Sequence, residues 1–508
     1  MLSSASTTTT VLVPVAGVAL SFLLIARLLR KPRAAGLPPG PPGLPILGNV
    51  LDMPSVTEWL TFSKWGAKYG GICSVTLLGQ PIVILNSAAA MEELDSKGAV
   101  FSTRPRLPMA GELVGYDQTL VLLPYGPRFR VFRKYFAKLV GAPNVFRQFV
   151  PLVELETHRY LKRLLLKPGA EFIDGHLRKL IGGTILRIAY GIDVVQDGED
   201  PFVSLIEKAN DNFNAATAPG AFMVDVFPSL LHVPEILAPF KRTARVWALA
   251  TRNMVEAPYL FVRRQMAAGT APVSFVSSLL EDEDKLTEED IRDIKYTASS
   301  LYGGGADTTA AGLYAFFLAM VLFPDVQRKG QQEMDSLLGG ARLPVYADAV
   351  HLPYVSAMVT ELLRWHSVAP LGVPHAAIED TVVNDYLIPK GTIIIANLWN
   401  MMNDPAVYPS PEKFDPARHM RTHTGEPQRD PRHASFGFGR RICPGRELAE
   451  ISLFMCIATT LATFDIAPGA GPLPMHENTQ GTISHAKPFD CVVKPRSEKV
   501  VALISGES

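Results

Sequence analysis

The sequence predicts a mainly α-helical protein with smaller β-sheets, of the α+β class. Three observations lead to this prediction. Apolar residues recur at helical spacing over most of the chain, including 288–323 and the run after Gly445. Two short stretches, 70–86 and 386–397, alternate like strands around Gly-containing turns. The chain has 508 residues without an internal repeat of 20–50 residues, so one large catalytic body fits.

The N-terminal residues 1–33 predict a membrane anchor. Residues 1–26 carry no charge, and the apolar run 11–26 is followed by the basic stretch 27–33. Positive charges after the apolar run predict a retained single-pass helix with a cytosolic body, whereas a cleaved signal peptide carries them before it. Residues 34–48 contain "GLPPGPPGLPILG" and predict a semi-rigid hinge, with a flexible linker as the alternative. Residues 49–508 then form the catalytic domain.

Composition excludes several functional classes. The chain has 49 basic and 49 acidic residues, so it lacks the positive charge of a nucleic-acid-binding protein. Four cysteines are too few for a disulfide scaffold. Cys73, Cys456 and Cys491 lie in apolar segments and are predicted to be buried thiols. Cys443 differs, because it lies in "FGFGRRICPG" (436–445), among glycines and arginines and before a helix. This setting stabilises a thiolate, and the open roles are metal ligand, nucleophile, disulfide partner and buried filler.

The helix predicted from Glu288 contains "GGGADTT" (303–309), and Thr287 with Asp290 forms a potential capping box at its start. Each glycine costs a helix about 1 kcal/mol relative to alanine, so a function should offset the cost. Gly304 and Thr308 share one face, with Asp307 beside them. This face could admit a small ligand and relay a proton to it. The alternative is a kinked structural helix whose polar side chains are satisfied locally.

A second apolar helix, 352–370, carries Glu361 and Arg364 three residues apart. If this pair is buried, it needs a further partner, and Arg418 in "PEKFDPARH" (411–419) is the candidate. The alternative is a surface ion pair of little energetic consequence.

These stretches together resemble the cytochrome P-450 family of haem-thiolate monooxygenases. The loop 436–445 is similar to the family's haem loop at Phe436, Gly439, Arg441, Cys443 and Gly445. The stretch 304–309 resembles the oxygen-activation helix, 361–364 the Glu-x-x-Arg pair, and 414–419 the element that supplies Arg418. The resemblance covers essentially the whole chain.

Two positions depart from the family pattern. Phe129 stands where Trp is usual, four residues before Arg133, and it has no indole N–H to donate to a haem propionate. His419 stands where Phe is commoner, and the sequence suggests no role for it. "GVPH" (372–375) resembles a family strand and would place His375 near a propionate.

The resemblance implies the cytochrome P-450 fold, with haem b between the oxygen-activation helix and the Cys loop. Cys443 would be the axial iron ligand, and Arg133, His375 and Arg441 would bind propionates. Asp307 and Thr308 would deliver protons, with Gly304 leaving room for oxygen. The implied reaction is the hydroxylation or epoxidation of an apolar small molecule, a haem-dependent monooxygenase activity in secondary metabolism or xenobiotic oxidation.

The resemblance also implies partners. Only 65 residues follow Cys443, too few for a fused flavin domain, so electrons are expected from a separate NADPH-cytochrome reductase, with a b-type cytochrome as an optional second donor. The expected docking face contains Arg128, Arg130, Lys134 and Lys138. The expected location is the endoplasmic reticulum membrane, and the closest overall likeness is to fungal microsomal enzymes.

Three alternative functions were considered, and two of them remain open. A zinc finger at "HMRTHTGEP" (419–427) is excluded, because no cysteine pair lies upstream within reach. A haem-thiolate isomerase or dehydratase would need no reductase, and a haem carrier or sensor would need no proton relay. By resemblance, segments before Tyr125, around Leu371 and around Ile483 line the substrate pocket, but they do not identify the substrate.

Overall fold

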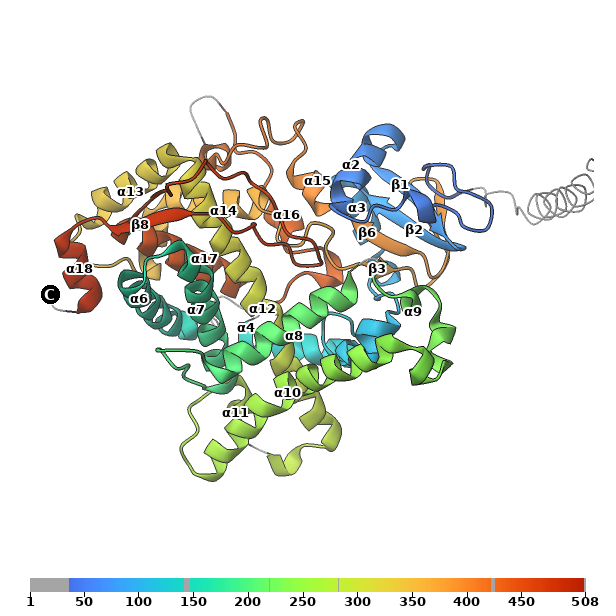
Figure 1. The fold of residues 1–508 in the computed structure, drawn as a ribbon, viewed down its shortest axis with the longest axis horizontal. Coiled ribbons are helices and arrows are strands. Elements are labelled where there is room, and N and C mark those ends of the chain that lie inside the picture. The colour runs from blue at the N-terminus through green and yellow to red at the C-terminus, as the bar shows by residue number, and fades with distance from the viewer. Residues whose placement is uncertain (1–35, 141–146, 219, 282, 422–424, 507–508) are drawn as a thin grey trace, which may run out of the picture. The chain divides into compact units, whose positions relative to one another are not determined.

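The computed structural model describes residues 36–140, 147–218, 220–281, 283–421 and 425–506. The predicted anchor at 1–33 lies outside these residues. The described chain forms two compact units (Figure 1). Unit 1 combines the chain up to Thr103 with Pro374–Asn397, and unit 2 contains Arg104–Val373 and the chain from Leu398 onward. The predicted catalytic domain, 49–508, is therefore divided between both units.

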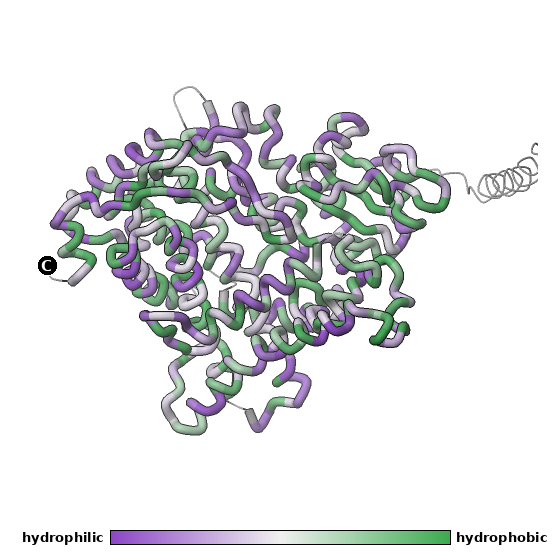
Figure 2. The backbone as a smooth tube through the Cα atoms, viewed as in Figure 1, coloured by the Kyte–Doolittle hydropathy of each residue, from purple (hydrophilic) through white to green (hydrophobic). Residues whose placement is uncertain are grey.

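Unit 1 is built on a four-stranded sheet in the order β1-β2-β6-β3. The predicted hairpin at 70–86 is confirmed as β1 (Ile72–Leu77) and β2 (Gln80–Leu85), which pair antiparallel. β2 then pairs parallel with β6 (Ile393–Ala396), which pairs antiparallel with the short β3 (His375–Ala376). These strands are apolar, and Figure 2 draws them largely in the hydrophobic colour. The other elements of unit 1 are α2 (Glu58–Tyr69), α3 (Ala88–Ser96), β4 (Thr381–Val383) and β5 (Tyr386–Ile388).

The described part of the proline-rich segment is tied to β1. The carbonyl of Pro39 accepts a hydrogen bond from the backbone N–H of Ser74 at 2.9 Å, and that of Pro38 accepts one from the Ser74 hydroxyl at 2.6 Å. A Cβ atom at Gly40 would lie 1.8 Å from the Ser74 carbonyl oxygen, so only glycine permits this approach. From Pro38 onward, the segment is part of the folded unit.

Unit 2 is mainly helical, and its central element is α12 (Glu288–Leu322). The predicted capping box is present, because Thr287 and Asp290 exchange side-chain and backbone hydrogen bonds. α12 continues through its three glycines and packs against neighbouring helices on several sides. Those neighbours are α4 (Pro127–Val140), α7 (Ala170–Tyr190), α8 (Pro201–Thr217), α10 (Pro239–Ala267) and α17 (Arg446–Thr463).

Of the helices that the structure describes, only α12 is long and apolar enough to span a membrane, and 83% of its most apolar window is buried within the protein. Its length and composition are therefore those of a core helix.

The remaining elements of unit 2 surround this core. The longer helices are α6 (Val150–Leu166), α13 (Pro324–Leu338), α14 (Pro353–Trp365) and α18 (Glu498–Ser505), and a small sheet pairs β7 (Phe464–Pro468) with β8 (Cys491–Pro495). The short helices are α9 (Met223–Val226), α11 (Phe275–Leu279), α15 (Leu398–Met402) and α16 (Arg432–Ser435), with a π-helical turn η3 at Pro108–Leu113. This mainly helical architecture with small sheets agrees with the predicted class.

Candidate active site

The loop that carries Cys443 is shaped by its glycines. Gly437 and Gly439 adopt φ angles of 73° and 59°, a left-handed conformation that side chains with a Cβ rarely adopt. The loop closes where the backbone N–H of Cys443 donates to the carbonyl of Phe436 at 2.8 Å. It ends at Gly445, the residue that caps α17. The motif residues thus hold the cysteine in a tight turn at the start of a buried helix.

The thiol of Cys443 differs from the other three. Cys73, Cys456 and Cys491 are buried as predicted, and burial raises the pKa of each thiol to about 12. Burial also raises the pKa of Cys443, but the backbone N–H of Gly445 and the charges of Arg133 and Arg446 oppose the shift. Cys443 nevertheless keeps an intermediate solvent-accessible surface. It is therefore the one described cysteine whose sulfur-bearing residue is not classed as buried.

Arg441 and Arg133 lie close to this thiol. Arg441 donates to the carbonyls of Leu120 and Leu123 at 3.3 and 2.6 Å, and Arg133 donates to that of Ile442 at 2.8 Å. Burial, followed by the charge of Arg133, lowers the pKa of Arg441 to about 10. Burial likewise lowers the pKa of Arg133. Two half-buried cations that repel each other favour the binding of an anionic group between them.

Arg104 joins this cluster, and sequence reasoning missed it. Its guanidinium donates to the carbonyls of Val121 and Val373 at 2.9 and 2.6 Å. Burial, followed by the charge of Arg441, lowers the pKa of Arg104 well below its usual range. The signal in the sequence was an arginine two residues after the stretch "AVFS" (99–102), and that signal is weak. We call Arg104, Arg133 and Arg441 the arginine cluster.

Phe129 has a role that the sequence did not suggest. Its ring is buried, and the guanidinium of Arg441 stacks over it at 4.0 Å from the ring centre. The phenylalanine therefore positions Arg441 by a cation–π contact, although it cannot itself donate a hydrogen bond.

His375 lies on β3 in unit 1 and is buried. Its Nδ1 lies 2.7 Å from the carbonyl oxygen of Phe101. Because a carbonyl only accepts, Nδ1 carries the hydrogen, and a further hydrogen bond donated by Nε2 requires the imidazolium form.

The three glycines of α12 have different surroundings. A Cβ atom at Gly305 would lie 2.7 Å from the Ile185 side chain, so this glycine allows α7 to pack closely. Gly304 is exposed, and a Cβ atom there would meet nothing within 4 Å. The Thr308 hydroxyl donates to the Gly304 carbonyl at 2.9 Å, so both residues lie on one face, as predicted. That face of an otherwise buried helix is open.

Asp307 is buried, directly precedes Thr308 in α12, and contacts two basic side chains. Its Oδ1 accepts from Arg178 of α7 at 2.7 Å, and its Oδ2 lies 3.3 Å from Nε2 of His485. Burial alone would raise the pKa of Asp307, but His485 and Arg178 outweigh it and lower the pKa. Neither partner was expected from the sequence, because each comes from a distant segment.

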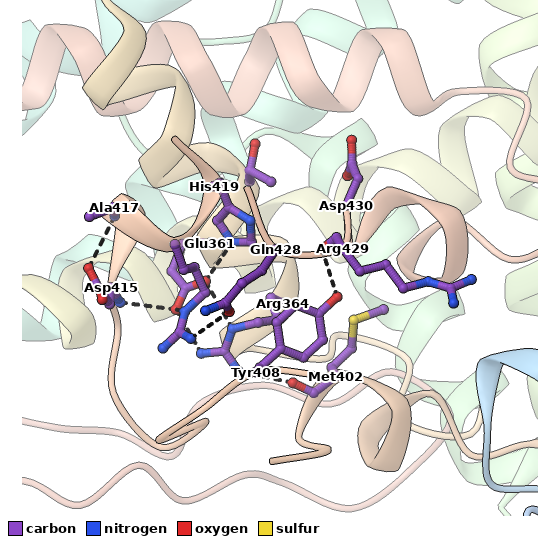
Figure 3. A network of polar contacts seen from close by, with 12 residues as sticks. Glu361, Arg364, Met402, Tyr408, Asp415, Ala417, His419, Gln428, Arg429 and Asp430 are labelled. Atoms are coloured by element: carbon purple, nitrogen blue, oxygen red, sulfur yellow. Dashed lines mark hydrogen bonds and ion pairs between the residues drawn. The ribbon is translucent and has the colours of Figure 1, made fainter. Parts of the chain in front are cut away.

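Glu361 and Arg364 meet in the interior (Figure 3), and Arg418 joins them there. Arg364 binds the carboxylate with two parallel hydrogen bonds of 2.7 and 2.9 Å, and Arg418 adds one of 3.1 Å. The side chains of Glu361 and Arg364 are 0% exposed, which excludes the alternative of a surface pair. Burial opposes the charge on Glu361, yet its hydrogen-bonded partners lower its pKa.

His419 is a fourth member of this network (Figure 3). Its Nε2 donates to Oε2 of Glu361 at 2.7 Å, and the backbone N–H of Asp415 donates to Oε1 at 3.0 Å. The histidine that stands where phenylalanine is commoner therefore supplies a hydrogen bond that phenylalanine cannot make.

We expect His419→Phe to lower the free energy of unfolding by about 1.5 to 3 kcal/mol, the usual value of a hydrogen bond to a charged group. Chemical denaturation at neutral pH measures this. The matched control is His433→Phe, at an exposed position of α16, which should change stability by less than about 0.5 kcal/mol. Equal stabilities for His419→Phe and the unchanged protein would mean that the bond to Glu361 contributes nothing.

The network connects α14 to the segment that leads to the Cys loop. Arg364 donates to the Met402 carbonyl at 3.0 Å, and Arg418 donates to Oε1 of Gln428 at 2.9 Å. Further along, Arg432 donates to the Thr360 hydroxyl at 2.7 Å and pairs with Glu450 of α17 at 3.2 Å. The chain on both sides of the Cys loop is therefore tied to α14.

Comparison with known proteins gives a consistent result. The family model described as Cytochrome P-450 matches residues 38–493. Cytochrome P-450 monooxygenase 208 of Postia placenta is 46% identical over 497 residues, covering 96% of each chain. Cytochrome P-450 monooxygenase claR of Ampulloclitocybe clavipes is 42% identical, covering 96% of this chain and 91% of the relative. Cytochrome P-450 monooxygenase CLM2 of Gibberella zeae is 40% identical, covering 92% and 91%.

Proposed function

The chain belongs to the cytochrome P-450 family, which binds haem through a cysteine thiolate, and on this basis we propose that it is a monooxygenase that inserts one oxygen atom into an apolar small molecule. The observation that carries the proposal is the Cys443 thiol, which is held in a closed glycine turn, is not fully buried, and lies near the arginine cluster.

The residues present fit haem b. Cys443 would hold the iron, and the arginine cluster would bind the two propionates. The role predicted for His375, which lies in unit 1, stays a prediction. The loop residues Phe436, Gly439 and Gly445 shape the turn that presents the sulfur. An iron held by cysteine thiolate receives electron density that favours O–O cleavage, and this is the chemistry that the group supplies when bound.

Residues of α12 would leave room for oxygen and deliver protons. Gly304 leaves room at the open face of α12, and Thr308 presents its hydroxyl on the same face. Asp307 is the residue before Thr308, and Arg178 fixes the orientation of its carboxylate. We assign proton delivery to Asp307 and Thr308. Glu361, Arg364 and Arg418 position the segment that precedes the Cys loop.

The proposed electron donor is a separate NADPH-cytochrome reductase, with a b-type cytochrome as an optional second donor. Its docking face would include Arg130, Lys134 and Lys138, which follow each other at four-residue spacing and are exposed on α4. Arg128 is removed from this set, because it pairs with Asp293 at 2.7 Å and stacks over Phe132.

The double substitution Lys134→Glu and Lys138→Glu should raise the KM for the reductase about tenfold at low salt, because it reverses the charge that attracts an acidic partner. The measurement is the rate of NADPH-driven haem reduction as a function of reductase concentration. The matched control is Lys162→Glu, an exposed lysine of α6. An unchanged KM, or one that does not depend on salt, would assign docking to another surface.

The proposed location is the endoplasmic reticulum membrane, with residues 1–33 as a single-pass anchor and the body in the cytosol. Exposed apolar side chains of unit 2 support contact with a bilayer. In the segment from α9 to Ala238, the side chains of Met223, Phe227, Ile236 and Leu237 are exposed, with Ile236 at 86% and Leu237 at 74%. An apolar substrate would partition into the same membrane. Secondary metabolism and xenobiotic oxidation are the two settings in which such an activity is useful.

The proposal is tested by co-expressing the full chain with an NADPH-dependent reductase and supplying isotopically labelled O2 with a panel of apolar compounds. We expect one labelled oxygen atom per product molecule and no product without reductase. Product formed from a peroxide substrate without reductase would favour the isomerase or dehydratase alternative. Haem reduction with substrate-dependent spectral change but no product across the panel would favour a carrier or sensor.

A further inference from the structure

The Asp307 carboxylate has little direct contact with solvent. Its side chain is 6% exposed, whereas the role proposed for it requires that each proton it releases be replaced. Replacement must therefore come through a neighbouring group. The described partners of its carboxylate are Arg178, on Oδ1 at 2.7 Å, and His485, on Oδ2 at 3.3 Å.

These two partners differ in chemistry. The guanidinium of Arg178 is sensitive to burial, which lowers its pKa, but Asp174 and Asp307 raise the pKa by more. Arg178 therefore stays charged and releases no proton. Imidazole is the side chain that exchanges protons near neutral pH. Of the two groups, only His485 can transfer a proton to Asp307.

The surroundings of the Asp307 carboxylate are rich in acidic groups. Arg178 is shared between Asp307 and Asp174, both at 2.7 Å, so two carboxylates surround one guanidinium and leave one net negative charge. Glu207 of α8 lies near Arg178 and its two carboxylate partners, Asp174 and Asp307. Burial raises its pKa, and the charge of Asp307 adds to the shift. His485 is the second basic side chain that the structure describes at this carboxylate.

The neighbouring imidazole, that of His366, adds no positive charge near Asp307. His366 lies in the same region, and burial, followed by the charges of His476 and His485, lowers the pKa of His366 to about 3. His366 is therefore neutral near pH 7. Its ring donates from Nε2 to the carbonyl of Ser484 at 3.2 Å, which fixes the residue before His485.

The backbone also holds His485 in place. Its N–H donates to the Thr479 hydroxyl at 2.9 Å, and its carbonyl accepts from the Thr479 N–H at 2.8 Å. The side chain of His485 is 17% exposed, about three times the value for Asp307. The ring is thus fixed against the carboxylate and still reaches water.

We propose that His485 is the residue that returns protons to Asp307 during turnover, an inference that rests on the proton-delivery role assigned above. The proton on Nε2 of the imidazolium passes to Oδ2 of Asp307, which leaves a neutral imidazole and a carboxylic acid. The acid then gives its proton towards Thr308, and the imidazole takes a new one from water. The distance of 3.3 Å is long for a hydrogen bond, and such contacts commonly tighten in the working complex.

The first test needs no turnover. Asp307→Asn, His485→Gln and the double variant form a cycle in which chemical denaturation of the haem-loaded protein measures stability at about pH 6 and about pH 9. A protonated imidazole binds a carboxylate more strongly than a neutral one, and histidine side chains in general lose their charge between about pH 5 and 8. We expect a coupling of at least about threefold in the unfolding equilibrium constant at the lower pH and none at the higher. Absence of coupling at both would overturn the inference.

The second test is NADPH-driven O2 consumption with the reductase. His485→Gln should slow it about tenfold and introduce a solvent deuterium isotope effect, while the matched control His158→Gln, whose ring bonds to the Ile504 carbonyl, should not. Slowing without an isotope effect or pH dependence would indicate a structural role and overturn the inference. If Asp307→Asn slows the reaction and His485→Gln does not, the inference alone fails. If neither variant slows it, the proposed role of Asp307 fails too.

Discussion

Replacing Cys443 by alanine should abolish the strongly red-shifted Soret band that forms when the reduced, haem-loaded protein binds carbon monoxide, and monooxygenase turnover should fall below detection. The band requires a thiolate ligand, and no other side chain donates comparable electron density to the iron. Of the four cysteines, only Cys443 is not fully buried. Burial raises the pKa of its thiol, and Gly445, Arg133 and Arg446 oppose that rise.

Cys491→Ala is the matched control, since Cys491 is a buried thiol of β8 with a pKa near 12 and should leave the band unchanged. Cys443→Ser adds a second comparison, because it preserves the size of the side chain but supplies oxygen in place of sulfur. A red-shifted band that persists in Cys443→Ala would assign the iron to another ligand. A band at the shorter wavelength of an imidazole-ligated haem in the unchanged protein would contradict the monooxygenase proposal.

Glu361→Ala should be the most destabilising substitution outside the Cys loop. It leaves Arg364 and Arg418 buried without the carboxylate that both now bind, and His419 loses its acceptor. Breaking a buried pair by removing one partner costs about 3 to 5 kcal/mol, a large part of the about 5 to 15 kcal/mol that stabilises a folded protein. We expect little haem-loaded protein to accumulate, and Glu361→Gln to be intermediate because it retains one oxygen acceptor.

A control variant and the pH dependence of stability test this prediction further. Glu426→Gln is the control, since Glu426 pairs with Arg421 on the surface and should change stability by less than about 0.5 kcal/mol. The acid sensitivity has a definite sign. Because the pKa of Glu361 is lowered in the fold, its contribution is present above the ordinary glutamate pKa of about 4.3 and is lost as pH falls through the lower native value. Normal accumulation and stability of Glu361→Ala would show that the network is dispensable.

Features that depend on neighbours in the sequence were predictable. The helix from Glu288, its capping box, the hairpin at 70–86 and the shared face of Gly304 and Thr308 all follow from spacing of a few residues. The pairing of Glu361 with Arg364 also follows from helical spacing, although its burial did not.

Features that depend on distant segments were not predictable in the same way. Arg178 and His485 reach Asp307 from positions more than a hundred residues away, and Arg104 reaches the arginine cluster from a loop without regular periodicity. Only the packing of α7, α12 and the C-terminal segment brings such groups together. The departures at Phe129 and His419 were visible in the sequence. Their roles became clear only from the contacts of these residues with Arg441 and Glu361.

The parallel pairing of β2 with β6 has a consequence for biosynthesis. Ile82 is aligned with Ile393, so the sheet of unit 1 cannot be completed until a segment about 310 residues further along the chain has been synthesised. At ribosomal rates of about 5 to 20 residues per second, the edge of β2 waits roughly 15 to 60 s for its partner. An unpaired, apolar strand edge is a site of aggregation. Expression yield should therefore depend on chaperones that bind the nascent chain during this interval, and fragments that end before Ala396 should be recovered mainly as insoluble protein.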